Sequence, residues 1–93
     1  METNVKTLNN KRFGILVKNV KIDTSYNLHS EALVEIAEFF GYEEYISKFK
    51  EYSEKETLTV EDFNVRCEVK DRMFFIIQAE YGNDVVERLD KVM

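Results

Sequence analysis

The sequence predicts an α+β domain in which two hairpins build a small antiparallel sheet, in the order β-β-α-α-β-β-α, with helices packed mainly on one face. Three observations lead to this prediction. β-prone residues occupy 5–22, two amphipathic segments lie between residues 30 and 52, and apolar residues alternate with polar ones along 64–81. With 93 residues, 44 % of them hydrophobic, the chain is expected to form one globular domain, 1–93.

The first hairpin is expected within residues 5–22. Asn9 and Asn10 would form its turn, because asparagine tolerates the left-handed backbone of a tight turn better than most residues. After this turn, Phe13, Ile15 and Val17 fall on one face of a strand at a spacing of two. The segment therefore predicts two strands, and a third remains open beyond residue 19.

Two amphipathic helices are expected next. The first runs to Phe40 and stops at Gly41, a residue that commonly follows the last turn of a helix. Its apolar residues recur at a spacing of three and four on one side, and its glutamates gather on the other. The second helix, from Glu43 to about Tyr52, carries a stripe of aromatic residues. Both helices need an apolar surface on which to pack.

Residues 60–81 decide the fold class. Val65, Cys67 and Val69 alternate with polar residues, and the odd positions 73–81 continue this pattern, which is typical of a hairpin. The rival interpretation is one long helix from Val60 to Tyr81, because several apolar residues also fall on a helical stripe, namely Phe63, Cys67, Phe74, Ile77 and Tyr81. Residues 59–62 match a helix-capping box, but the strand pattern after them is equally compatible with a loop or a brief turn. We favour the hairpin because in a helix the remaining apolar residues would scatter around the whole circumference. In a hairpin, Phe74 and Ile76 would lie on the face opposite Phe75.

A short terminal helix is expected after Gly82. Asn83 is a favourable N-cap, and the residues beyond it place their apolar side chains on one side at helical spacing. This helix is expected to cover one face of the strand that precedes it.

Composition excludes several classes of function. The single His29 and the single Cys67 leave no multi-histidine metal site and no nucleophile with an evident base, and the three glycines form no phosphate-binding loop. We therefore expect no enzyme, metal or cofactor. The longest apolar run, 73–77, is too short to span a bilayer, and no export signal is visible. A lone cysteine fits a reducing compartment, so a cytoplasmic location is expected.

Charge is distributed unevenly along the chain, whose net charge is −5. Residues 1–22 hold five basic residues and one acid, whereas residues 23–63 hold eleven acids and three lysines. Acidic helices of this kind repel nucleic acid and attract basic surfaces. The middle of the chain is therefore the candidate for a binding surface.

The favoured hypothesis is a non-catalytic protein-interaction domain that docks an acidic helical face onto a basic surface of a nucleic-acid-binding protein. Such an acidic protein could be an inhibitor of the sort that a phage or mobile element encodes. The candidate residues are Glu31, Glu35, Glu38, Glu43, Glu44 and Glu51.

Two alternatives differ from this hypothesis in their partner. In the first, a basic N-terminal hairpin binds nucleic acid through Lys6, Lys11, Arg12, Lys18 and Lys21. In the second, the protein is a structural homodimer sealed through Phe74 and Ile76 or through the terminal helix.

Overall fold

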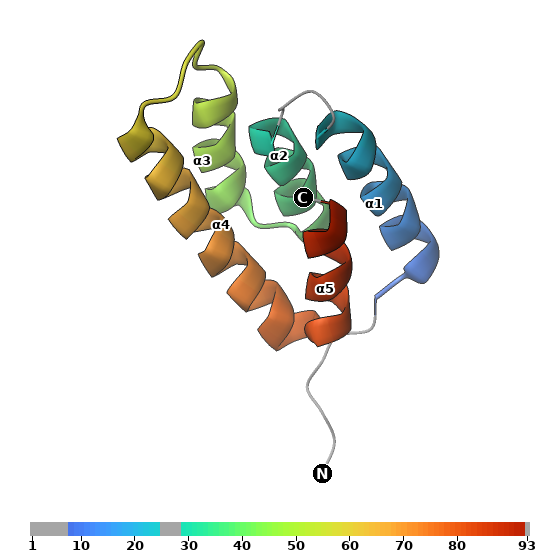
Figure 1. The fold of residues 1–93 in the computed structure, drawn as a ribbon. Helices are drawn as coiled ribbons and strands as arrows, with labels where there is room; N and C mark the ends of the chain where they lie inside the picture. The colour runs from blue at the N-terminus through green and yellow to red at the C-terminus, as the bar shows by residue number, and fades with distance from the viewer. Residues whose placement is uncertain (1–7, 25–28, 93) are drawn as a thin grey trace.

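A computed structural model describes residues 8–24 and 29–92 and shows five helices, with no strand in these ranges (Figure 1). The predicted α+β fold with an antiparallel sheet is therefore wrong, and the domain is all-helical. The helices are α1 (Asn10–Thr24), α2 (His29–Phe40), α3 (Glu43–Ser53), α4 (Val60–Tyr81) and α5 (Asn83–Val92).

The five helices surround one core. Each helix packs on the next one in the chain, and α5 returns to pack on α1. Helices α1, α2 and α3 lie side by side with α2 in the middle, and the pair α4 and α5 covers them (Figure 1). Because α2 has a neighbour on either side and the α4–α5 pair above it, only a narrow strip of its surface can reach solvent.

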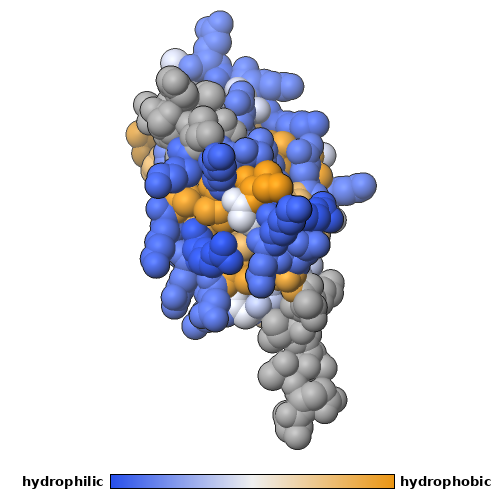
Figure 2. All heavy atoms as spheres, turned by 90° about the vertical axis from the view of Figure 1, so that its right-hand side faces the viewer, coloured by the Kyte–Doolittle hydropathy of each residue, from blue (hydrophilic) through white to orange (hydrophobic). Residues whose placement is uncertain are grey.

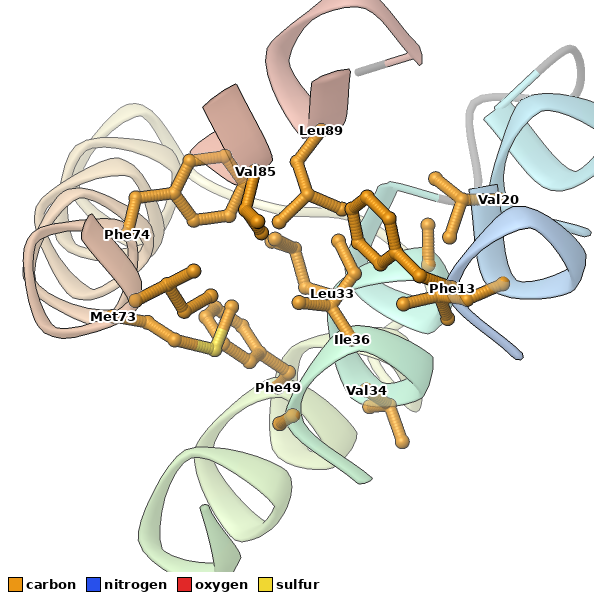
Figure 3. Packing of buried hydrophobic residues seen from close by; sticks show 14 residues of the cluster. Phe13, Val20, Leu33, Val34, Ile36, Phe49, Met73, Phe74, Val85 and Leu89 are labelled. Atoms are coloured by element: carbon orange, nitrogen blue, oxygen red, sulfur yellow. The ribbon is translucent and has the colours of Figure 1, made fainter. Parts of the chain in front are cut away.

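All five helices contribute side chains to the core (Figure 3). Phe13 of α1, Ile36 of α2, Phe49 of α3, Met73 of α4 and Leu89 of α5 are each fully buried. Burial of apolar side chains of this size provides the main driving force for folding, about 1.5–3 kcal/mol for each.

The predicted first hairpin is wrong in the described part of its range, because residues from Asn10 onward form α1. The Asn9 side chain does not form a hairpin turn. Its Oδ1 atom accepts hydrogen bonds from the backbone N–H groups of Lys11 at 3.1 Å and Arg12 at 3.2 Å, which caps the helix. Phe13 and Val20, seven residues apart, then lie on the same buried side of α1.

The predicted second hairpin is also wrong, because residues 60–81 form the single helix α4. A capping box starts this helix. The Thr59 hydroxyl accepts a hydrogen bond from the Asp62 N–H at 3.0 Å, and the Asp62 carboxylate accepts one from the Thr59 N–H at 3.3 Å. Lys55 lies 2.9 Å from the same carboxylate, and its hydrogen bond is the main reason that the pKa of Asp62 is lowered.

Two neighbouring phenylalanines show the consequence of this change from hairpin to helix. Phe74 is 6 % exposed and packs in the core, whereas Phe75 is 71 % exposed. The hairpin prediction placed Phe75 with Met73 and Ile77 on one face; the structure buries Met73 and Ile77 together with Phe74 instead. Phe74 is therefore already buried within the domain, so the homodimer hypothesis depends on the half-buried Ile76 or on the terminal helix α5.

The predictions of helices at α2, α3 and α5 are confirmed. α2 ends before Gly41, which has φ +80°, and α5 starts directly after Gly82, which has φ +100°. α3 follows α2 after two residues. Tyr42, in this turn, donates a hydrogen bond of 2.6 Å from its hydroxyl to Glu80 near the end of α4. Burial, and then this hydrogen bond, raise the pKa of Tyr42, so the tyrosine stays protonated and ties the turn to α4.

Candidate functional site

The surface strip of α2 consists of glutamates. Ser30, Ala32, Leu33, Val34, Ile36 and Ala37 are all buried, which leaves little of this helix for solvent. Glu31 and Glu38 are exposed and Glu35 is half-buried. These three residues recur at a spacing of four and three, so they lie along one side of the helix. Glu31 and Glu38 therefore present their carboxylates to solvent, whereas the Oε2 atom of Glu35, between them, is buried.

Three further glutamates lie on α3, which packs directly against α2. Glu43, Glu44 and Glu51 are all exposed, and the first two follow the tight turn that reverses the chain after α2. That turn is closed by hydrogen bonds from the N–H groups of Gly41 and Tyr42 to carbonyl groups of α2. The six glutamates of α2 and α3 together form the acidic face of the protein, where Lys48 and Lys50 reduce the net charge to −4.

Most carboxylates of the acidic face are not paired with a basic side chain among the described residues. Within residues 8–24 and 29–92, five of its members form no ion pair, namely Glu31, Glu38, Glu43, Glu44 and Glu51. The helix arrangement therefore brings together carboxylates from two helices without pairing these five to lysine or arginine. Their mutual repulsion is tolerated because all five reach water.

The basic residues of the first segment lie on α1. Lys11, Arg12, Lys18 and Lys21 are exposed on this helix, and Lys6 lies outside the described residues. Arg12 lies close to the acidic face. It lines a groove between α1 and α2 together with Glu35 and Glu38, and its guanidinium carbon lies 5.4 Å from the centre of the Phe39 ring. Arg12 and the acidic face therefore meet along this groove.

Hydrophobic side chains also reach the surface at this groove. Figure 2, which views the molecule from the side of α1, shows apolar patches between charged side chains. Ile15, Leu16 and Phe39 line the groove, and Ile15 is 55 % exposed. The edge of the acidic face therefore offers apolar contact area as well as charge.

Sequence reasoning missed the exposed apolar residues of α4. Val60, Phe63, Val65 and Phe75 are between 38 % and 79 % exposed. The signal for them was present in the sequence, because a helix over 60–81 has apolar residues around its whole circumference and cannot bury them all in one core. That scatter argued for a hairpin, but in the structure it marks surface that the core leaves uncovered.

No group of three or more histidine, cysteine, aspartate or glutamate side chains in the described ranges could hold a metal ion. None of the five helices is long and apolar enough to cross a bilayer.

Fold and surface together define an all-helical protein with a two-helix acidic face and a basic first helix. Comparison of the chain with protein-family models, with curated proteins and with solved structures gave no significant match.

Proposed function

We propose that the protein is a non-catalytic interaction domain that docks its acidic face onto a basic surface of another protein. The observation that carries the proposal is the accessible side of α2, where Glu31, Glu35 and Glu38 lie in a row. The three exposed glutamates of α3 continue this charge on the neighbouring helix. Charges of one sign, grouped on a rigid pair of helices, attract a surface of the opposite sign and orient it before contact.

The partner that best fits this chemistry is a protein that binds nucleic acid. Such proteins use lysine and arginine side chains to contact successive phosphates. A row of carboxylates on a helix competes for the same side chains, and the bulk of the domain then blocks access to the groove. Inhibition by occupying a phosphate-binding surface requires no chemical reaction, which agrees with the absence of a recognisable catalytic motif in the sequence.

The experiment compares two triple variants with equal changes in net charge. The first replaces Glu38, Glu44 and Glu51 of the acidic face by glutamine. The control replaces Glu56, Glu68 and Glu87, which are also exposed but do not belong to the acidic face, by glutamine. Each variant and the wild type are immobilised and used to capture proteins from a cell lysate at low and high salt.

The proposal predicts that the wild type and the control retain the same basic protein at low salt and that the acidic-face variant does not. Circular dichroism of each variant checks that the helices persist. If the two triple variants retain the same proteins in the same amounts, the acidic face is not the binding surface.

A second candidate function is nucleic-acid binding through α1, favoured by four exposed cations on this one helix, Lys11, Arg12, Lys18 and Lys21. Against it stands the net charge of −5, which repels phosphates at longer range. A gel-shift assay with duplex DNA and with RNA separates the two functions. Binding that persists at moderate salt, and that is lost when Lys11 and Lys18 become glutamine, would favour α1 over the acidic face.

A further inference from the structure

One side of α4 is buried along only part of its length. Phe63, Cys67, Phe74 and Ile77 recur at a spacing of three, four and seven and so share one side of the helix. Phe74 and Ile77 are buried in the core, whereas Phe63 is 47 % exposed and Cys67 is half-buried. The same apolar side is therefore covered near the C-terminal end of α4 and uncovered near its N-terminal end.

The cause is the difference in length between α4 and α5. α4 has 22 residues and α5 has 10, which correspond to about 33 Å and about 15 Å. The two helices diverge from their junction at Gly82, so α5 accompanies only the C-terminal half of α4 (Figure 1). The N-terminal half of α4 is left facing the start of α2 across a gap.

This gap is a cleft of about 560 Å³. Leu33, Leu58, Phe63 and Cys67 give it an apolar lining. Its other lining residues are His29, Arg66 and Lys70, and no aspartate or glutamate from the described ranges lines it. A mainly apolar cleft of this size with a few polar groups is typical of a site for a small molecule.

The cleft is positively charged although the protein as a whole is acidic. Arg66 donates a hydrogen bond of 3.0 Å to the Ser30 hydroxyl, and its guanidinium lies 5.0 Å from the centre of the Phe63 ring. Lys70 lies 5.3 Å from the centre of the Phe74 ring. Neutral groups thus hold both cations in place, and neither forms an ion pair within residues 8–24 and 29–92.

The positive charge of the cleft also affects the pKa of His29. Burial lowers its pKa, and the charges of Arg66 and Lys70 lower it further. The imidazole therefore stays neutral near pH 7, and it can donate a hydrogen bond without adding to the positive charge.

We propose that this cleft binds a small amphipathic carboxylate, that is, an unbranched apolar acid of medium chain length. Its carboxylate would be held by Lys70 and Arg66, and its hydrocarbon chain would cover Leu33, Leu58 and Phe63. The charge of the cleft selects an anion, and the apolar lining selects a chain over a compact polar anion such as phosphate. This site adjoins the acidic face, because Leu58 and Arg66 also line a neighbouring pocket together with Glu31, but it does not depend on the function proposed for that face.

Cys67 provides the readout, because it lines the cleft and is the only cysteine in the chain. Iodoacetamide, a small neutral reagent, alkylates this thiol at a rate that falls when a ligand covers it. Decanoate should slow alkylation in a saturable manner, whereas hexanoate should require a higher concentration and decyltrimethylammonium should give no protection. Chemical shifts in amide spectra should change at Leu33, Leu58 and Phe63.

Two lysine variants test the role of charge. Lys70→Gln should weaken decanoate binding about tenfold, because it removes a charge-assisted interaction with the carboxylate. Lys48→Gln makes the same change in net charge on the exposed side of α3 and should leave binding unchanged. Circular dichroism and the alkylation rate without ligand show whether each variant keeps its fold and an intact cleft.

Three results would overturn the proposal. One is equal protection of Cys67 by the cationic and the anionic chain, and another is equal binding of decanoate by the two lysine variants. The third is protection by an acidic apolar peptide in the absence of any protection by decanoate, which would make the cleft a docking site for a protein segment. Capture of a basic protein by the acidic face is measured separately, so either proposal can fail without the other.

Discussion

Truncating two adjacent phenylalanines of α4 should have very different effects on stability. Phe74 is 6 % exposed and packs in the core, whereas Phe75 is 71 % exposed. Phe74→Ala leaves a cavity between α4 and α5 and should lower the free energy of unfolding by about 3–5 kcal/mol. For a domain of this size, whose total stability is about 5–14 kcal/mol, that is a large fraction.

Phe75→Ala should cost much less. About 29 % of this side chain is buried, or about 60 Å² of a surface near 200 Å², so the lost burial is worth at most about 1.5 kcal/mol. Alanine also has a higher helix propensity than phenylalanine, by about 0.5 kcal/mol, which leaves a net cost of about 1 kcal/mol or less. The two variants should therefore differ by at least about 2 kcal/mol, or roughly 8–16 °C in Tm.

Urea unfolding followed by circular dichroism measures the free energy of unfolding of both variants. The comparison requires that the slope of this free energy against urea concentration is the same for both variants. A β-hairpin over residues 64–81 would place Phe75 beside Met73 and Ile77 and would give it the larger cost. If Phe75→Ala is as destabilising as Phe74→Ala, the helical assignment of this segment is wrong.

Three further predictions concern the helices and the cleft. Gly14→Ala should raise the free energy of unfolding by about 0.5–1 kcal/mol, because Gly14 lies within α1 and nothing lies within 4 Å of the added methyl group. Gly41→Ala should lower the free energy of unfolding, because Gly41 has a positive φ of +80°. The Tm of each variant, measured by thermal unfolding, tests both predictions. Thr59→Ala should cost about 1 kcal/mol through loss of the cap of α4, and Thr59→Ser should restore most of it in the same assay, since serine also caps. The pKa of His29 is lower in the folded protein than in the unfolded chain, so the unfolded chain binds a proton at this imidazole more readily. Neutral His29 therefore contributes to stability above pH 6.5, and this contribution is lost as the pH falls through the folded pKa. Urea midpoints across this range should show that the pH dependence decreases in His29→Gln, and an unchanged dependence would contradict the shift.

Local signals in the sequence correctly predicted α2, α3 and α5. In each of them the apolar residues recur at helical spacing, and a glycine with positive φ marks the end of α2 and the start of α5. These signals are short-range, so they can be read without knowledge of the tertiary structure. The glutamates of α2 could be placed on one side of the helix for the same reason.

The two predicted hairpins failed for a different reason. Asn9 is equally suited to a tight turn and to a helix N-cap, and only the second role agrees with the burial of Phe13, Leu16 and Val20. In α4 the alternation of Val65, Cys67 and Val69 looked like a strand because the helix has apolar residues on several sides. The capping box at Thr59 was the correct local signal, and it was outweighed by this pattern.

The cleft could not have been predicted from local patterns. Its lining comes from the start of α2, from Leu58 and from four residues of α4, and it exists because α5 is shorter than α4. Such a site depends on where a helix ends relative to its neighbour in space. That relation follows from packing, which a single sequence does not reveal.

The central claim, that the acidic face steers the protein to a cationic partner, is tested most directly by the rate of association with the captured protein. This rate is measured at several salt concentrations for the wild type and both triple glutamine variants. We predict that the acidic-face variant associates at least about tenfold more slowly at low salt and depends less on salt, and that the control behaves as the wild type. Equal rates and equal salt dependence for the two variants would contradict the claim.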